Sequence, residues 1–404
     1  MSDSTLTHHD LSTLARQWHE ALVAEGEFAR AFRRELHATP RVSGDEADTR
    51  DRFAQATGLT VRHVADTGGI GRLGPASGPA IAIRGELDAL PVVEATGVEF
   101  ASTTGNMHAC GHDVHLAALA ALVRAASTLE LPYALIPVLQ PREEAYPSGA
   151  LDIQRSGVLA DEGVVHAIGA HVHPRVPRGS VATGAGAVNA AAGELEVIVT
   201  GKGGHGAYPH HASDVVAALS SIALGLPEVV RRTVDPLAPA LLSVGRLIAD
   251  SGAANVLPAE GRLLATVRTT GIGDAQRIAD AVARFAEGQA ASYGVTATTR
   301  HTEGEPVLAN DAALSQAIDR LLPGFGLVPA EPMRSLGADD FSFFSEEFPS
   351  VMCFVGVGDA DDLMAGPSLH DSTFLPDEDA VLRVANTMLA GYLAAVESIR
   401  AREQ

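Results

Sequence analysis

The stretch AIAIRGELDAL, residues 80–90, starts with an unbroken apolar run and ends with two carboxylates, Glu86 and Asp88. A short apolar run of this kind predicts a buried strand. Similar runs follow at 133–140 (YALIPVLQ, interrupted by Pro137), 166–173 (HAIGAHVH) and 351–358 (VMCFVGVG). An Ala/Leu-rich segment at 115–126 predicts a helix between the first two runs. Nearly continuous apolar strands separated by helices predict a mainly parallel sheet with both faces covered.

The middle of the chain has a different pattern. GELEVIVTG (193–201) alternates apolar and polar residues, which predicts a strand with one buried face. The elements expected after it are a helix at about 213–231, strands at 240–249 and 261–269, a helix at about 274–291 and a strand at 294–300. The order β-α-β-β-α-β is that of a ferredoxin-like unit. We therefore predict an α/β domain made of residues 1–186 and 301–404, interrupted by a small α+β domain at 187–300.

Length and the start of the chain agree with this division. A chain of 404 residues exceeds what one hydrophobic core usually serves. Residues 11–37 are predicted to be helical, because apolar side chains recur there near the 3.6-residue period. These side chains are Leu14, Trp18, Leu22, Phe28, Phe32 and Leu36.

Composition limits the possible partners and compartment. The formal net charge is −21 and Lys202 is the only lysine, which argues against a nucleic-acid partner. No stretch approaches the roughly 18 apolar residues of a membrane span, and the start MSDSTLTHHD has neither a basic nor an apolar signal region. Cys110 and Cys353 are too few and too far apart for a disulfide framework. These features predict a cytoplasmic enzyme or binding protein.

Side chains that bind metals or move protons follow several of the predicted strands. In open α/β sheets the ligand site lies beyond the carboxyl ends of the strands. The groups expected there are Glu86 and Asp88, Glu143 and Glu144, His171 and His173, His370, and the segment HACGHD at 108–113. Five separated segments thus bring carboxylates, imidazoles and one thiol to one edge of the sheet.

This composition suits divalent metal ions. Thiolate, imidazole and carboxylate groups together form a plausible zinc-binding set, and a pair of ions needs more than the usual three or four ligands. Adjacent glutamates such as Glu143 and Glu144 permit one to bind metal and the other to take a proton from water. Attack of that water on a carbonyl is hydrolysis, most plausibly of an amide.

Other interpretations of these residues remain open from the pattern alone. Cys110 could be a small buried apolar residue, or a nucleophile with His108 or His112 as its base. The pair Glu143–Glu144 could lie in a solvated loop. Histidines elsewhere, such as His37 and His166, could equally be structural, with their nitrogens satisfied by hydrogen bonds.

A series of motifs resembles one family. They are HACGHD (108–113) followed by His115, QPREE (140–144), GAHVHP (169–174), GKGGHGAYPH (201–210), ANVLP (254–258) with TVR (266–268), GADDFS (337–342) and LHDSTF (369–374). In this order they are similar to the M20 metallopeptidase family, in the amidohydrolase branch that cleaves N-acyl amino acids (hippurate hydrolase and auxin-conjugate hydrolase types). The resemblance extends from Leu36–His37 to Asp377–Glu378. It implies a two-metal catalytic domain with an inserted lid or dimerisation domain.

The resemblance also implies a role for each matching residue. The metal ligands would be Cys110, His112, Glu144, His171 and His370. Glu143 would be the general acid/base, and Asp88 would orient a ligand or the water. In the inserted domain, His205 would stabilise the oxyanion, reaching across a dimer into the neighbouring copy. Asn255 and Arg268 would hold the substrate, since a guanidinium group can bind a carboxylate through two hydrogen bonds.

The chain departs from the family pattern at three places. It has Glu86-Leu87-Asp88 where the family usually shows Asp-Met-Asp, so the first acid is one methylene longer. Ala145-Tyr146-Pro147 replaces the small Gly-rich residues that usually follow the paired glutamates. Asp339 replaces a more common glutamate. None of these changes removes an expected ligand, but Tyr146 would alter the rim of the substrate pocket.

The function expected from these observations is metal-dependent hydrolysis of N-acyl or N-aroyl amino acids in the cytoplasm. Two divalent ions per chain are expected, zinc first and manganese, cobalt or nickel otherwise. A homodimer or higher oligomer through the inserted domain is expected, with no nucleic-acid or membrane partner. Dipeptides are the nearest competing substrate class. The pattern also leaves open a non-catalytic binding protein that retains metal and a cysteine-dependent amidase.

Overall fold

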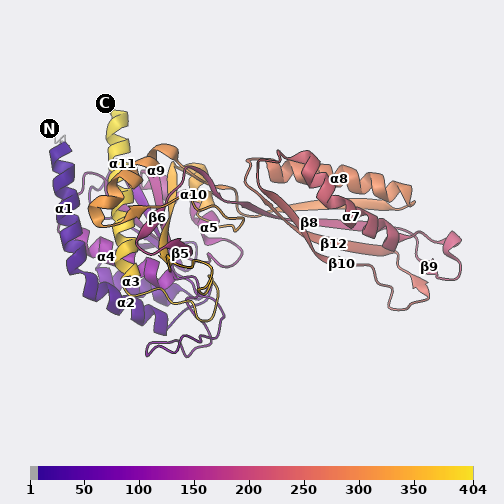
Figure 1. The fold of residues 1–404 in the computed structure, drawn as a ribbon, viewed down its shortest axis with the longest axis horizontal. Helices are drawn as coiled ribbons and strands as arrows, with labels where there is room; N and C mark the ends of the chain where they lie inside the picture. The colour runs from indigo at the N-terminus through magenta and orange to yellow at the C-terminus, as the bar shows by residue number, and fades with distance from the viewer. Residues whose placement is uncertain (1–7, 404) are drawn as a thin grey trace. The chain divides into compact units, whose positions relative to one another are not determined.

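The computed structural model describes residues 8–403, which form two compact units (Figure 1). Unit 1 contains the chain up to Gly186 together with Ala309–Met333 and the part from Asp340 onward. Unit 2 contains Ala187–Leu308 and Arg334–Asp339. Unit 2 continues past residue 300, because its last strand pairs as far as Glu303 with Gly193. It also takes in 334–339, where Ser335 pairs with Asn189.

Unit 1 is built on an eight-stranded sheet that is mainly parallel, which confirms the predicted fold class. In spatial order the strands are β1 (Val61–Val64), β2 (Gly68–Gly71), β4 (Ala134–Gln140), β3 (Ala80–Glu86), β5 (Val164–Pro177), β16 (Ser350–Gly358), β6 (Ser180–Ala182) and β15 (Val328–Pro329). The central four, β4, β3, β5 and β16, are parallel to their neighbours in this group. β2 and β6 add antiparallel pairs on either side of them.

Helices cover the sheet, and the strands lie between α4 and α11 on one side and α5 and α10 on the other (Figure 1). The helices of unit 1 are α1 (His8–Ala24), α2 (Gly26–Ala38), α3 (Ala47–Thr57), α4 (His112–Ala126), α5 (Gly149–Ser156), α6 (Val158–Asp161), α9 (Ala312–Leu321), α10 (Ser342–Glu347) and α11 (Ala380–Glu403), with a 3₁₀ turn at Leu322–Phe325. α4 and α11 are buried on nearly every side, because α1 and α2 pack against them from outside. In the described chain no helix is long and apolar enough to cross a membrane.

Residues 11–37 are helical as predicted, except for a break at Glu25. α1 ends at Ala24 and α2 begins at Gly26, with Glu25 in a turn between them. Glycine is a weak helix former, and the Glu25 carboxylate accepts a 2.6 Å hydrogen bond from Arg124 of α4. The apolar period continues across the junction because both helices pack against the same core, so the pattern does not reveal the turn.

Pro137 does not interrupt its strand. β4 is continuous from Ala134 to Gln140, and Pro137 lies opposite Ile83 of β3. On the other side, β4 exchanges hydrogen bonds with Leu73 through Leu135 and pairs again with β2 from Val138. Pro137 lies in the gap between these pairings, so its missing N–H removes a link on the β2 side only.

Unit 2 is an antiparallel sheet with two helices on one face. Its elements are β8 (Ala191–Thr200), α7 (Val215–Thr233), β10 (Ala240–Ile248), β12 (Glu260–Thr269), α8 (Asp274–Ser292) and β13 (Thr296–Glu303). The strand order β10-β12-β8-β13, antiparallel throughout, is that of a ferredoxin-like unit. Alternate residues of β8, namely Leu195, Val197 and Val199, pack with α7 and α8 in one core. The smaller elements of unit 2 are β9 (Gly204–His205) paired with β11 (Val256–Leu257), and a 3₁₀ turn at Pro209–His211. The short strands β7 (Gly186–Asn189) and β14 (Leu308–Asn310) pair where the chain passes from one unit to the other.

Candidate metal centre

The loop before α4 presents Cys110 and His112 beyond the ends of the central strands. Gly111 adopts a positive φ of 84°, and a Cβ atom there would lie 2.5 Å from a methyl group of Val172. Only glycine therefore permits this close turn. His112, the first residue of α4, donates through Nδ1 to the carbonyl oxygen of Asp88 at 2.9 Å. Its Nε2 is buried and has no hydrogen-bond partner.

A second turn presents Glu143 and Glu144 after β4. Arg142 has a positive φ of 47°, which is a strained conformation for a residue with a side chain. Its backbone N–H donates to Glu46 at 2.7 Å, and its guanidinium group donates to the carbonyl oxygens of Ala65 and Pro147. These hydrogen bonds hold the turn that directs the two glutamates toward the end of the sheet.

Asp88 connects the two turns. One of its carboxylate oxygens accepts the N–H of Glu144 at 3.0 Å and the hydroxyl of Ser43 at 2.7 Å. Burial acts to raise the pKa of Asp88, but the interaction with His112 and these two hydrogen bonds outweigh it and hold the pKa below its usual value. Asp88 is therefore an anion that fixes the backbone of Glu144 and the orientation of His112.

His171 enters the site from β5. Its Nδ1 donates to the carbonyl oxygen of Val172 at 2.7 Å, which leaves Nε2 with a lone pair 3.5 Å from Cys110 Sγ. Burial lowers the pKa of His171 well below its ordinary value, and the charges of His115 and His112 lower it further. A neutral imidazole is the form that binds metal.

His370 completes the group from the long loop after β16. Its backbone N–H donates to the carbonyl oxygen of Ala109 at 2.9 Å, and its φ of 69° is positive. Its Nε2 lies 3.1 Å from Glu144 Oε1, and its side chain is 52% exposed. Four separate segments therefore bring Cys110, His112, Glu144, His171 and His370 into one connected cluster, as their positions after the strands indicate.

The residues present fit a divalent metal. Donor atoms of Cys110, His112 and Glu144 all lie within 4.8 Å of one another, and His112 Nε2 is buried without a hydrogen bond. Burial raises the pKa of the Cys110 thiol well above its usual value, and the negative charges of Glu144 and Glu143 act in the same direction. A cation among these groups would reverse that effect and favour the thiolate. The cluster thus has the donor types and the unmet electrostatic demand of a metal site.

Glu143 lies beside this group. Its Oε2 is 3.8 Å from His112 Nε2, and its side chain is 12% exposed. A partly accessible carboxylate next to metal donors suits proton transfer to and from a substrate. By contrast, His173 does not join the cluster, because its Nδ1 accepts the N–H of Arg175 at 3.2 Å and its ring packs on Phe354.

Sequence reasoning missed the role of two buried residues behind the donors, His115 and Arg84. Glu86, His112, His115 and His171 form a second group of close donor atoms. Both nitrogens of His115 are already used, since Nδ1 lies 3.1 Å from Glu86 and Nε2 accepts the N–H of Val172 at 2.9 Å. The signal that could have pointed to this role is a histidine inside the otherwise apolar run HLAALAAL of α4.

The residues expected to act from unit 2 lie at its two ends. Val256, next to Asn255, pairs with His205, and the Asn255 carbonyl oxygen accepts the N–H of Gly206 at 2.7 Å. Arg268 lies near the other end of β12, opposite Ala192. The length of β12 from Glu260 to Arg268 is roughly 26 Å at the rise of a strand. Unit 2 therefore does not bring Arg268 together with His205 and Asn255.

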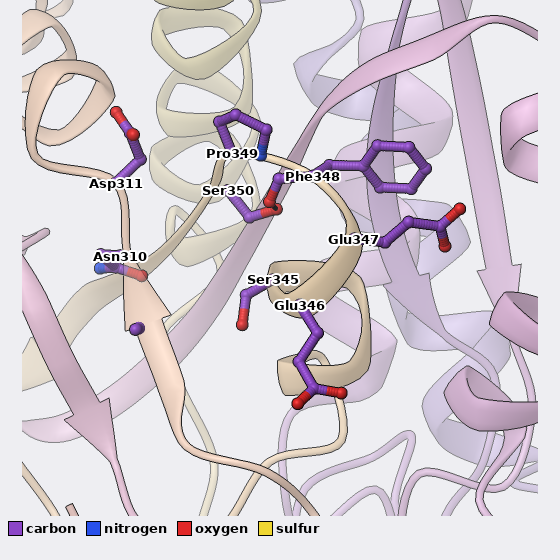
Figure 2. Close-up of a pocket in the computed structure, with 9 residues that line it drawn as sticks. Asn310, Asp311, Ser345, Glu346, Glu347, Phe348, Pro349 and Ser350 are labelled. Carbon is purple, nitrogen blue, oxygen red and sulfur yellow. Dashed lines mark hydrogen bonds between the residues drawn. The ribbon is translucent and has the colours of Figure 1, made fainter. Parts of the chain in front are cut away.

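A cavity of about 280 Å³ lies elsewhere in unit 1. Figure 2 shows its lining, which includes Asn310, Asp311, Glu346, Glu347 and Ser350. Ser350 begins β16, so this cavity lies at the amino end of that strand, away from the edge that carries the donors. It contributes none of the metal-binding groups.

Comparison with known proteins agrees with the fold and with a metal-dependent hydrolase. A family model described as peptidase family M20/M25/M40 matches residues 82–401. An N-acetylcysteine deacetylase of Bacillus subtilis (strain 168) is 34% identical over 372 residues, which cover 89% of this chain and 94% of the relative. An N-acetyldiaminopimelate deacetylase of Shouchella clausii is 34% identical and covers 78% of this chain and 82% of its own. The crystal structure of the Bacillus subtilis YXEP protein, a dinuclear metal-binding peptidase of the M20 family, matches with a TM-score of 0.79 and 28% identity, over 95% of this chain and 99% of that one.

A mainly parallel α/β sheet with thiol, imidazole and carboxylate donors gathered beyond its strands defines a metal-dependent hydrolase. The chain belongs to peptidase family M20/M25/M40. The resemblance given by its motifs is thereby confirmed.

Proposed function

We propose that this protein hydrolyses the amide bond of N-acyl or N-aroyl amino acids and releases a carboxylic acid and a free amino acid. The observation that carries the proposal is the cluster of Cys110, His112 and Glu144 with Glu143 beside it. The names of two relatives, an N-acetylcysteine deacetylase and an N-acetyldiaminopimelate deacetylase, support this substrate class.

The proposed metal ligands are Cys110, His112, Glu144, His171 and His370, holding two divalent ions. Zinc fits a set that contains a thiolate and imidazoles, and manganese, cobalt or nickel could replace it. Bound ions would polarise the scissile carbonyl and make a water molecule more acidic.

The remaining steps belong to side chains of the chain itself. Glu143 accepts a proton from the attacking water and donates it to the departing amine, for which its exposed edge gives access. Asp88 holds His112 and the backbone of Glu144 in position throughout. Arg268 is proposed to bind the substrate carboxylate, with Asn255 assisting, and His205 is proposed to donate to the oxyanion.

We further propose a homodimer formed through unit 2. β10 is an edge strand of its sheet, and three of its apolar side chains, Val244, Leu247 and Ile248, are at least 40% exposed. An exposed apolar edge favours pairing with another copy. A partner would also supply His205 and Asn255 from the end of unit 2 remote from Arg268. A reducing compartment such as the cytoplasm suits the two free, buried thiols of Cys110 and Cys353.

Cysteine-dependent amide hydrolysis fits the site less well. A nucleophilic cysteine must be a thiolate, whereas burial raises the pKa of Cys110. The candidate base His108 has a pKa lowered to about 4 by its burial, so it accepts a proton poorly at neutral pH.

The deciding experiment is a panel of N-acyl amino acids and dipeptides assayed with the purified protein, together with metal analysis. Hydrolysis of N-acyl amino acids, lost with EDTA and restored by a divalent ion, is the expected result. Preference for dipeptides would assign the competing substrate class. Activity that resists EDTA would point to the thiol mechanism, and metal binding without any turnover would indicate a binding protein.

A further inference from the structure

A chain of buried polar contacts runs from Arg84 to His171 behind the donor cluster. The Arg84 guanidinium lies 3.0 Å from one oxygen of Glu86, and the other oxygen of Glu86 lies 3.1 Å from His115 Nδ1. The Nε2 of His115 accepts the N–H of Val172 at 2.9 Å. The carbonyl oxygen of Val172 accepts the Nδ1–H of His171 at 2.7 Å.

Each contact fixes the next one. Because His115 Nε2 accepts a backbone N–H, the proton of the neutral ring must be on Nδ1, which then donates to Glu86. Val172 is held on both sides, by His115 at its N–H and by His171 at its carbonyl oxygen. The His171 ring is thereby oriented with Nε2 facing Cys110, and the rings of His115 and His171 pack with centroids 4.4 Å apart.

This series of polar contacts is also shielded from water. Arg84, Glu86 and His115 are at most 2% exposed. Buried charges are tolerated when they are paired and hydrogen-bonded, as Arg84 is with Glu86. A lysine or a shorter acid would not span these contacts in the same way, and Glu86 occupies a position where the family pattern usually has aspartate.

We propose that Arg84, Glu86 and His115 form a positioning relay that fixes the tautomer and direction of His171 as a metal ligand. This inference rests on the proposed metal centre. His115 is a positioning residue, since it acts on His171 through the backbone of Val172. Partners behind metal-binding histidines typically change metal affinity by about 10–100-fold when they are removed.

The test uses His115→Leu, which removes both ring nitrogens, and His115→Gln, which keeps an acceptor for the Val172 N–H. Zn²⁺ affinity is measured by competition with a chelator, and the visible spectrum of the Co²⁺-loaded protein reports ligand geometry. We expect His115→Leu to weaken Zn²⁺ binding about 10–100-fold and change the Co²⁺ spectrum, and His115→Gln to recover part of both. In the metal-free protein, the amide of Val172 should exchange hydrogen faster in His115→Leu.

The matched control is His166→Leu, the same substitution at another fully buried histidine, which lies on β5 and outside the relay. It should bind Zn²⁺ like the unmodified protein. An equal loss in the control, or unchanged affinity and spectrum in a folded His115→Leu, would overturn the relay.

If His115→Leu does not fold, Glu86→Gln decides the question. This variant keeps size and shape but removes the charge, and we expect a smaller loss in the same direction. Normal Zn²⁺ affinity in it would overturn the proposal. Failure of the unmodified protein to bind metal would overturn the proposed function and the relay together, whereas normal metal binding with insensitive relay variants would overturn the relay alone.

Discussion

Glu143 and Glu144 are neighbours in sequence but have different surroundings. Glu144 is held by Asp88 through its backbone and faces His370, whereas Glu143 lies beside His112, with its Oε2 3.8 Å from His112 Nε2. Glu143→Gln is expected to keep metal and lose about 10²–10⁴-fold in kcat, because an amide cannot accept the proton of water. Glu144→Gln is expected to lose metal instead. Metal content and kcat of both variants decide the assignment, and the reverse pattern would exchange the two roles.

Cys110 tests the metal assignment directly. Cys110→Ser replaces a thiolate by a hydroxyl group, which is a much poorer ligand for zinc. We expect the variant to release metal at chelator concentrations that the unmodified protein tolerates, with activity falling in parallel. Cys353→Ser is the control, since Cys353 is also buried and free but lies outside the donor group. Full metal occupancy and activity in Cys110→Ser would remove this residue from the ligand set.

His166 predicts a pH dependence of stability. Its ring is fully buried, its Nδ1 lies 3.2 Å from the carbonyl oxygen of Pro349, and its Nε2 has no partner. Burial lowers the pKa of His166 below the ordinary value of 6.5. The unfolded chain then binds a proton below pH 6.5 that the folded protein does not, so stability is full above pH 6.5 and falls as the pH drops below it.

The loss should approach about 1.4 kcal/mol for each pH unit below 6.5, until the folded-state pKa is reached. The free energy of unfolding is measured by urea denaturation between pH 5 and pH 8, in the unmodified protein and in His166→Leu. The variant should show a shallower decline. Parallel curves would show that His166 makes no contribution to the acid sensitivity.

The sequence predicts some site residues better than others. Cys110, Glu143 and His370 could be placed near one edge because each follows a strand or precedes a helix. The relay could not be predicted, because it depends on which residues of β3, α4 and β5 become neighbours. That proximity is set by strand order and tertiary packing rather than by any spacing along the chain.

At the scale of elements, β10 is the feature with the clearest consequence for assembly. Leu247 lies on the exposed edge of the unit 2 sheet and is 43% exposed. Leu247→Asp should shift a dimer toward monomer in analytical ultracentrifugation, because like charges would face each other where two edges pair. Leu237→Asp makes the same change at a side chain that is 90% exposed outside the strand, and it should leave the dimer intact. If the dimer persists in Leu247→Asp, the interface lies at a surface other than β10.

The strands of both units follow the apolar patterns closely, and the errors have local causes. The expected strands at 80–83 and 166–173 are longer in the structure, as β3 and β5, because polar residues such as Arg84 and Arg175 continue the pairing or the extended backbone. The turn at Glu25, which was not predicted, has a similar cause. Apolar side chains on both sides of Glu25 pack against the same core although the helix is interrupted there. Periodicity reports which side chains are buried, and it reports element ends only indirectly.

At the scale of the whole molecule, the separation of Arg268 from His205 allows a complementation test. If each site uses Arg268 from one copy and His205 from the other, a mixed dimer of His205→Ala and Arg268→Ala chains contains one intact site and one doubly altered site. Each variant alone should be nearly inactive, while the mixture should regain up to about half of the activity per mixed dimer. No recovery in mixtures shown to exchange subunits would mean that each site takes both residues from the same copy.

Arg268 also predicts substrate selectivity. Arg268→Ala should raise KM strongly for substrates with a free α-carboxylate and change it little for the corresponding amides, because only the carboxylate can be bound by the guanidinium fork. kcat/KM for the acid and amide forms of one substrate provides the measurement. In the structure Arg268 donates to Thr266 and to the carbonyl oxygen of Val267. Equal losses of kcat/KM for the acid and amide forms would mean that Arg268 has only this structural role.

The insertion of unit 2 inside unit 1 sets the order in which a ribosome can complete them. All strands of the unit 2 sheet have been synthesised once Glu303 is made, but β5 gains its neighbour β16 only after Ser350–Gly358. His370 follows later still. At about 5–20 residues per second, the nascent chain spends several seconds with a complete unit 2 sheet and an open β5 edge. Domains usually fold in order from the N-terminus during synthesis. Here that order is reversed, because unit 1 begins first along the chain and its sheet is the last to be completed.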